Sequence, residues 1–328
     1  MGCVRIEDIP NFRVTSAMFE KIATINGLIK QTDEFKDKKV ELRLRKESKI
    51  RSINSSLAIE GNDLGFLTVR DVIDGKDVEG DYIDIVEVKN AVRAYGMIAS
   101  ADPWSIDDLL SIHSEMMFGL VEYEGFRKHG VGVYEGADRL VYKAPDPEDV
   151  PAMVGRLFEW GHNSELPAPI TAAIVHYYIE AIHPFEDGNG RMGRLWHTLL
   201  MRRYGRIFDL IPLESKIRSR QSEYYEALER CQGIDSQDCT GFIEFCLDIT
   251  ISSLEDLLHL KDPRMDRLMK AMGDEPMSAL DIMRSMGLSD RNHFKDMYLQ
   301  PAMGYGFVAM TEADKPSSPN QKYRKTIT

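Results

Sequence analysis

Apolar residues recur at three- and four-residue spacing along most of the chain, with polar residues between them. This period is typical of α-helices that bury one face. The stretches with this pattern are residues 18–31, 86–98, 105–120, 172–182, 191–204, 223–231 and 241–260. Ser105 stands at the start of the third stretch and is suited to cap its first turn. The pattern predicts a mainly α fold built around a helical bundle.

One region departs from the helical period. Within residues 129–151, Val131 and Val133 alternate with other residues before a Gly-Ala-Asp turn, and Leu140 and Tyr142 follow the turn. Alternation on both sides of a turn predicts a β-hairpin. A single hairpin has little stability of its own. We therefore expect a surface flap that is retained because it has a function.

The last part of the chain contains shorter elements. Two helices are expected on either side of Gly287, with Ser289 as the cap of the second, and two strands are expected after them. The expected helices are residues 278–287 and 289–303, and the expected strands are residues 304–311 and 323–326. This order outlines a winged helix-turn-helix. The whole pattern predicts an N-terminal helical region at 1–104, a core at 105–260 and a small winged-helix-like domain at 261–328.

Composition and charge narrow the classes of protein. The 328 residues carry a net charge of −12, with +2 on residues 261–328 and −14 on the rest, which argues against a chain-wide nucleic-acid surface. The cysteines, Cys3, Cys231, Cys239 and Cys246, lack the spacing of a zinc site or of a disulfide scaffold. No apolar run is long enough to cross a bilayer. We expect a cytoplasmic protein with no membrane partner.

Polar and flexible residues concentrate in HPFEDGNGRMGR, residues 183–194, between two predicted helices. The glycines lie at the start of the second helix, where free backbone amides and the helix dipole attract anions. Arg191 and Arg194 are three apart and share a helix face, where they can contact a polyphosphate. Asp187 would repel that anion unless Mg²⁺ lay between them. His183 adds a base that can be neutral near pH 7.

These residues carry the signature of the Fic family, H-x-F-x-[DE]-G-N-[GK]-R-x-x-R. All eight specified positions match: His183, Phe185, Asp187, Gly188, Asn189, Gly190, Arg191 and Arg194. Residues 105–257 resemble the family more widely, with a hairpin before the motif and a central helix pair around it. The resemblance implies transfer of AMP from ATP to a Ser, Thr or Tyr hydroxyl of a target protein, with release of pyrophosphate.

The resemblance also implies roles for the motif residues. His183 would deprotonate the target hydroxyl, and Asp187 would hold Mg²⁺ against the α- and β-phosphates. Gly188, Asn189 and Gly190 would form the anion hole, while Arg191 and Arg194 would contact the β- and γ-phosphates. Phe185 would be an apolar anchor in the core. The hairpin from Val131 to Tyr142 would pair with an extended stretch of the target.

A second family pattern, [ST]-x-x-x-E-[GN], occurs upstream as Ser56, Glu60 and Gly61. In Fic proteins it marks an inhibitory helix, expected here around residues 48–61. Its glutamate would pair with Arg194 and occupy the guanidinium that would otherwise bind the γ-phosphate. The resemblance therefore implies a self-inhibited enzyme. A homodimer stays an alternative to a monomer, because relatives often position this helix by forming dimers.

Alternative functions use the same site or the C-terminal domain. Glu60 could orient a water that removes AMP from a modified protein, and some Fic proteins transfer UMP, phosphocholine or phosphate. The complete motif favours a triphosphate donor, so ATP is the preferred substrate. A DNA-binding regulator is the alternative of another class. It is less favoured than a protein-interaction module, because residues 289–300 mix basic and acidic side chains.

Some residues have an ordinary structural interpretation. Tyr224 and Tyr225 lie where Fic proteins often place a nucleotide-pocket aromatic, and core packing explains such a pair equally well. His176 and His197 are interpreted as packing or surface histidines, since the H-x-x-x-H spacing of a helical zinc pair is absent. The cysteines at 231–246 are expected to pack inside helices.

Overall fold

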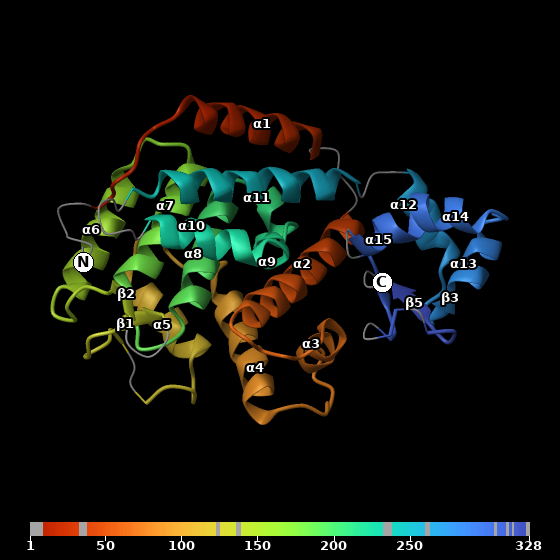
Figure 1. The fold of residues 1–328 in the computed structure, drawn as a ribbon, viewed down its shortest axis with the longest axis horizontal. Helices are drawn as coiled ribbons and strands as arrows, with labels where there is room; N and C mark the ends of the chain where they lie inside the picture. Colours follow the sequence, from red (N-terminus) through yellow and green to blue (C-terminus); the bar gives the residue numbers. More distant parts are fainter. Residues whose placement is uncertain are drawn as a thin grey trace. The chain divides into compact units, whose positions relative to one another are not determined.

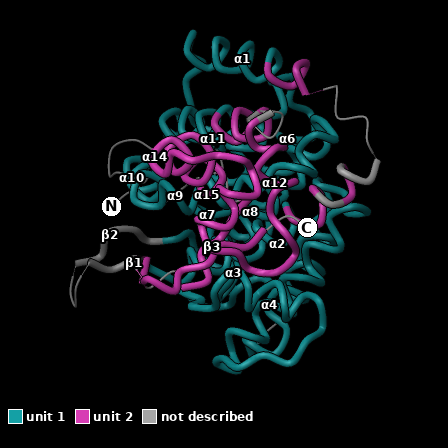
Figure 2. Tube along the Cα trace, turned by 90° about the vertical axis from the view of Figure 1, so that its right-hand side faces the viewer, with its two compact units in different colours: residues 1–27, 48–251 teal, residues 28–47, 252–328 magenta. Residues whose placement is uncertain are grey.

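The structure is a computed structural model of the full chain, drawn in Figure 1. It describes residues 9–32, 38–122, 125–135, 139–231, 238–259, 263–304, 307–312, 315–316 and 318–325. The chain divides into two compact units, coloured separately in Figure 2. Unit 1 comprises residues 1–27 and 48–251, and unit 2 comprises residues 28–47 and 252–328. The three regions expected from the sequence, 1–104, 105–260 and 261–328, stay a prediction.

The fold is mainly helical, as predicted. The helices up to residue 259 are α1 (Ser16–Thr32), α2 (Lys38–Ile59), α3 (Phe66–Ile73), α4 (Tyr82–Met97), α5 (Ile106–Met116), α6 (Val150–Asn163), α7 (Ala168–Ile182), α8 (Asn189–Tyr204), the 3₁₀ helix η2 (Arg206–Asp209), α9 (Leu213–Ser219), α10 (Gln221–Cys231) and α11 (Thr240–His259). The division between the units falls inside α1, α2 and α11. None of the helices in the described ranges is long and apolar enough to cross a membrane.

Helix α7 forms the centre of unit 1. Every residue from Pro169 to Ile182 is buried except the half-buried Glu180. Helix α8 packs beside α7 and is also buried along most of its length (Figure 1). A helix that is apolar all round must be enclosed by its neighbours. The turn that joins α7 to α8 is therefore held on a rigid base.

The expected caps were right in one case and wrong in another. The Ser105 hydroxyl accepts a hydrogen bond from the Asp108 backbone N–H at the start of α5, as predicted. Ser289 is not a cap. The side chain of the next residue, Asp290, accepts bonds from the N–H groups of Asn292 and His293, because the helix begins one residue later than the pattern indicated.

The predicted hairpin is present as β1 (Gly132–Glu135) and β2 (Arg139–Lys143). The two strands are antiparallel, and Val133 pairs with Tyr142 in the backbone register. Leu140 pairs with Tyr134, across a shift in register after Val133. The side chains of Val133, Leu140 and Tyr142 lie outside the described part of the structure. The half-buried Val131 precedes β1.

Unit 2 contains the short C-terminal elements. They are α12 (Pro263–Ala271), β3 (Met277–Ser278), α13 (Ala279–Ser285), α14 (Arg291–Phe294), the π-helical turn η3 (Lys295–Leu299), α15 (Gln300–Gly304), β4 (Val308–Met310) and β5 (Lys322–Lys325). The strands form an antiparallel sheet in the order β3, β5, β4. The helices and the last two strands agree with the pattern, and Gly287 has a positive φ of 68°. Strand β3 was missed, because two residues carry no alternation.

Candidate active site

The turn between α7 and α8 has an unusual backbone. His183 ends α7 in the left-handed region, with φ 52° and ψ 60°, and it is the only described non-glycine residue with a positive φ. Gly188 begins α8 with φ 86°. Left-handed backbone is costly for residues with a Cβ. A histidine held there indicates that the surrounding structure fixes its backbone in this conformation.

Asn189 fixes the shape of this turn. Its side-chain oxygen accepts a hydrogen bond from the Phe185 N–H, and its side-chain nitrogen donates to the Phe185 carbonyl, both at 2.9 Å. The side chain is buried, with 2% exposure. Because its amide is used internally, a contact of Asn189 with an anion would come from its backbone. The free amides of the first turn, from Asn189 and Gly190 onward, stay available there.

Phe185 is fully buried, as expected for an anchor. Its ring stacks on His113 of α5, with ring centres 3.6 Å apart. The His113 Nε2 also lies 2.9 Å from the Asp187 carbonyl oxygen. His113 therefore supports both an apolar and a polar part of the turn. The sequence did not point to this residue, because no spacing links α5 to the motif.

Arg191 lies between two carboxylates. It donates from Nη1 to Glu87 of α4 at 2.6 Å and from Nη2 to Asp187 at 3.0 Å. The arginine is buried, whereas the Asp187 side chain is 62% exposed. Asn62 donates to the other oxygen of Glu87 at 2.9 Å. Glu87 is a second residue of the site that the sequence did not reveal.

Arg194 is bound by the end of α2. Its Nη2 donates to Glu60 Oε1 at 2.6 Å and to the Ser56 carbonyl at 3.1 Å, and its Nε donates to the Ser56 hydroxyl at 3.1 Å. The guanidinium is 1% exposed. The negative charge of Glu60 raises the pKa of Arg194 against the opposing effect of burial. Such charge-assisted bonds are the strong ones in proteins.

Two glycines make this contact geometrically possible. A Cβ on Gly190 would lie 2.4 Å from Glu60 Oε1 and 3.0 Å from Arg194 Nη1, so Glu60 fills the space left by the missing side chain. Gly61 has φ 94° and ends α2, with its N–H donating to the Ala58 carbonyl. Glu60 thus stands just beyond the last helical residue, directed at the start of α8.

The position of α2 beside the site depends on a buried carboxylate. Glu214 of α9 is fully buried and accepts hydrogen bonds from the hydroxyls of Ser52 in α2, Tyr95 in α4 and Thr198 in α8. The distances are 2.6, 2.9 and 2.8 Å. Because buried charges are stable only when paired or hydrogen-bonded, this cluster fixes α2 against α8.

Glu180 and Tyr224 extend the polar network inward. The Tyr224 hydroxyl donates to Glu180 Oε1 at 3.0 Å and is itself fully buried. Burial raises the pKa of Glu180 to about 7, although the positive charge of Arg194 acts to lower it. Tyr225 is 41% exposed and donates to the Ile59 carbonyl at the end of α2. The two tyrosines therefore have different environments, one in the core and one at the surface.

His183 is held by Arg127, another residue that the sequence did not reveal. Arg127 is buried and donates to the backbone carbonyls of His183 at 2.7 Å and His129 at 2.8 Å. A further bond reaches the Pro145 carbonyl, just after β2. Arg127 therefore connects the base of the hairpin to the turn. Burial, with a smaller contribution from Arg127, lowers the pKa of His183.

A pocket of 810 Å³ opens beside the turn, within unit 1. Its lining comes mainly from α4, the residues between α3 and α4, and the segment after α5, and it includes Glu87 and Asp187. Arg194 and Glu60 do not line it. The pocket therefore reaches the Asp187 side of the site, while Glu60 covers the Arg194 side.

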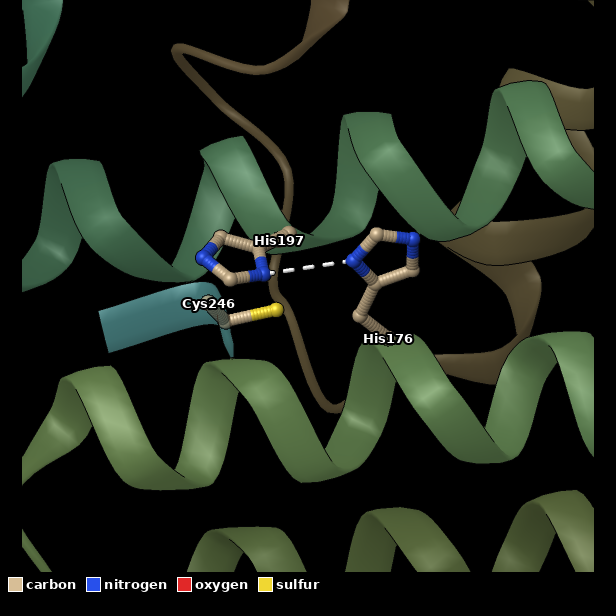
Figure 3. Close-up of side chains that lie close together, drawn as sticks. All are labelled: His176, His197 and Cys246. Atoms are coloured by element: carbon tan, nitrogen blue, oxygen red, sulfur yellow. Dashed lines mark hydrogen bonds between the residues drawn. The ribbon is translucent and has the colours of Figure 1, made fainter. Parts of the chain in front are cut away.

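The described part of the chain also contains one group of metal-ligating side chains. His176, His197 and Cys246 bring their ligand atoms within 4.8 Å of one another, and all three are buried (Figure 3). Of the two interpretations from the sequence, packing or surface histidines, the structure supports packing, since His176 and His197 are both buried.

Comparisons with known proteins agree with this geometry. The Fic/DOC family model matches residues 103–201, and the model of the Filamentation induced by cAMP protein Fic-like, C-terminal domain, matches residues 263–326. The crystal structure of a Fic family protein from Desulfovibrio desulfuricans G20 is 37% identical, covers 96% of this chain and 98% of that chain, and has a TM-score of 0.71. The chain belongs to the Fic family.

Two further relatives are more distant. The protein adenylyltransferase Fic of Drosophila melanogaster is 27% identical over 271 residues, which are 78% of this chain and 52% of that protein. This chain thus spans about half the length of that curated relative. The structure of a Fic domain containing signaling protein from Bacteroides thetaiotaomicron is 20% identical, with a TM-score of 0.62 over 76% of this chain and 97% of that chain. It supports the fold alone.

Proposed function

We propose that this chain is a protein adenylyltransferase that transfers AMP from ATP to a hydroxyl side chain of a target protein and is inhibited by Glu60. The observation that carries the proposal is the Arg194 guanidinium, buried at the start of α8 and bound by a carboxylate from a distant segment. A phosphate oxygen has the same charge and hydrogen-bonding capacity as that carboxylate. The site therefore suits a polyphosphate once Glu60 moves away.

His183 is the proposed general base. Its backbone is held in the turn, and its lowered pKa keeps the ring neutral near pH 7, so it can accept the proton of a target hydroxyl. Arg127 is a positioning residue, because its guanidinium donates to the backbone carbonyl of His183. The hydroxyl oxygen then attacks the α-phosphorus, and pyrophosphate leaves.

The residues present fit a magnesium ion. Asp187 offers a mostly exposed carboxylate beside the amides of α8, and Mg²⁺ is typically held by one or two carboxylates together with substrate phosphates. Asp187 would hold the ion. When bound, Mg²⁺ would neutralise charge on the phosphates. Arg191 bonds to Asp187 and would orient its carboxylate.

Inhibition by Glu60 follows from competition for one cation. While Glu60 occupies Nη2 of Arg194, a γ-phosphate meets an occupied guanidinium and an additional negative charge. The triphosphate would then bind weakly or with its α-phosphorus misplaced. Relief requires only that the segment after Ile59 moves, while Glu214 keeps the rest of α2 in place.

The hairpin is the proposed docking element for the target. Strands β1 and β2 precede α6, and Arg127 connects their base to His183. An extended target segment that adds to a strand edge is aligned through its backbone, with little demand on its sequence. The target hydroxyl would thereby be presented to His183.

Removal of AMP from a modified protein is the second candidate. It is favoured by the partial exposure of Glu60, whose side chain is 32% exposed and can reach a water. The same carboxylate would then activate that water instead of blocking a phosphate. Release of AMP from a premodified protein by the wild type, lost in Glu60→Gly, would support this reading.

One experiment tests the transfer. Wild type, Glu60→Gly and His183→Ala are incubated with α-labelled ATP, Mg²⁺ and a cell lysate, and labelled protein is measured. We expect weak label with wild type, strong label with Glu60→Gly and none with His183→Ala. Equal label with wild type and Glu60→Gly would remove the inhibitory role. Absence of label in all three, with ATP binding also absent, would contradict the proposed activity.

A further inference from the structure

We propose that His176, His197 and Cys246 form a binding site for a thiophilic d¹⁰ metal ion, Zn²⁺ or Cu⁺, inside unit 1. The three residues come from α7, α8 and α11, and their side chains point toward one another in Figure 3. Two imidazole nitrogens and one thiolate are a ligand set that these ions prefer. The site is separate from the magnesium position proposed at Asp187.

The spacing of the two imidazoles fits shared coordination. Their Nδ1 atoms lie 3.3 Å apart. Two nitrogens bound to one tetrahedral zinc at about 2.0–2.1 Å are separated by roughly 3.3–3.4 Å. The Cys246 sulfur lies within 4.8 Å of a ring nitrogen of each histidine. With bonds of about 2.0–2.1 and 2.3 Å, a tetrahedral ion holds nitrogen and sulfur roughly 3.6 Å apart, so the thiol would move by up to about 1.2 Å.

A hydrogen-bonded chain supports the outer nitrogen of His176. Its Nε2 lies 3.1 Å from the Tyr224 hydroxyl, which donates to Glu180 at 3.0 Å. Histidines that bind metals usually donate from their second nitrogen to a chain ending in a carboxylate. A proton on Nε2 of His176, donated to Tyr224, would leave the lone pair of Nδ1 for a metal. This hydrogen-bonded chain is an observation independent of the closeness of the three ligands.

Burial favours the neutral form of all three groups, which suits the two imidazoles, whereas Cys246 must lose its proton to bind a metal. Burial lowers the pKa of His176, and it lowers that of His197 to about 4, so both rings are neutral, as metal ligands must be. Burial raises the pKa of the Cys246 thiol. A thiolate there would need a cation, and binding of the metal would displace the thiol proton to solvent.

Metal content tests the site directly. The full chain is purified without a metal-affinity tag, incubated separately with Zn²⁺ and with Cu⁺ under reducing conditions, desalted, and analysed by plasma mass spectrometry. We expect about one ion per chain in the wild type. Cys246→Ser should lose that ion. Cys239→Ser is the matched control, since Cys239 is also a buried free cysteine but lies outside the cluster, and it should retain the ion.

Spectroscopy identifies the ligands even where a variant is less stable. Co²⁺ bound to the wild type should give the near-ultraviolet absorption of a thiolate–cobalt bond, and this band should be absent in Cys246→Ser and present in Cys239→Ser. His197→Gln should weaken binding without removing the band. Wild type that retains no more metal than Cys246→Ser would overturn the proposal and leave an ordinary hydrogen bond between two core histidines. The measurement needs neither ATP nor a target, so its failure is distinct from failure of the proposed transferase activity.

Discussion

The two arginines of the motif stand three residues apart on one face of α8, yet their carboxylate partners have different origins. Arg191 bonds to Asp187 of the same loop and to Glu87 of α4. Arg194 bonds to Ser56 and Glu60 at the end of α2. The first set builds the turn, whereas the second brings in a residue 134 positions away in the chain.

This difference indicates which contact can be released. Breaking the Arg191 set would disturb Asp187 and the shape of the loop itself. The Arg194 contact depends on a residue beyond the last turn of α2, followed by a glycine with positive φ. A small change in that segment can therefore remove Glu60 from Arg194 while α2 stays fixed through Glu214 and Ser56 keeps its bonds to the arginine. We infer that the Arg191 side is structural and the Arg194 side is regulatory.

The largest effect is expected from the proposed base, His183, which begins the same turn after α7. His183→Ala, introduced into the Glu60→Gly background, should lower the labelling rate by about 10²–10⁴-fold, the usual contribution of a positioned general base. Both arginine contacts stay intact in this variant. His162→Ala is the control, since His162 lies exposed near the end of α6. A similar loss in both variants would show that the effect is not specific to the base.

A smaller effect is expected where α2 ends. Gly61→Ala places a Cβ on a residue with φ 94°, which costs about 1–2 kcal/mol. We expect this strain to loosen Glu60 and to raise the labelling rate, by less than Glu60→Gly does. Gly65→Ala is the matched control, because Gly65 has an ordinary negative φ and open space around it. An unchanged labelling rate with a lowered melting temperature would show that the turn at Gly61 affects stability but not inhibition by Glu60.

Weakening the contacts of Arg191 should lower the labelling rate, whereas loosening Glu60 from Arg194 should raise it. Glu87→Gln removes the charge that Arg191 shares with Asp187 but keeps a hydrogen-bond acceptor. The Arg191–Glu87 pair is largely buried. The labelling rate in the Glu60→Gly background should fall by about fivefold, because a hydrogen bond to a neutral amide oxygen is weaker than a charge-assisted one by about 1 kcal/mol. A rise in the rate would mean that Glu87 is a second inhibitory group, and the contrast between the two arginines would be lost.

The smallest expected effect is a change in the free energy of unfolding with pH. The pKa of Glu180 is raised to about 7 from an ordinary value near 4.5, so the folded state retains this proton over a range in which the unfolded state has lost it. The contribution of Glu180 to stability is full below about pH 4.5 and is lost as the pH rises toward about 7. Urea unfolding of wild type should show this decline. Glu180→Gln should flatten it, and an unchanged slope would contradict the raised pKa.

Much of the fold was readable from local patterns. The helical period, the alternation around the Gly-Ala-Asp turn and the short C-terminal elements each depend on neighbouring residues. The turn between α7 and α8 could be predicted because its eight specified positions fall within twelve neighbouring residues, 183–194. Strand β3 and the Asp290 cap were not, since a two-residue strand has no period and adjacent Ser and Asp residues are both good caps.

The supporting residues of the site could not be read in this way. Arg127, His113 and Glu87 act through backbone carbonyls, a ring face and another residue's guanidinium. None of these partners is at a fixed distance along the sequence. The grouping of His176 with Cys246 has the same cause, because it depends on how α7, α8 and α11 pack. Tertiary packing, and not local propensity, brings these groups together.

The inhibitory role of Glu60 is tested most directly by a double-mutant cycle on ATP affinity. Calorimetry with Mg²⁺ is performed on wild type, Glu60→Gly, Arg194→Ala and the double variant. A charge-assisted bond of about 1.5–3 kcal/mol predicts that Glu60→Gly tightens binding by about 10–100-fold when Arg194 is present. No tightening is predicted in the Arg194→Ala background. Equal tightening in both backgrounds would contradict the account, because Glu60 would then act without Arg194.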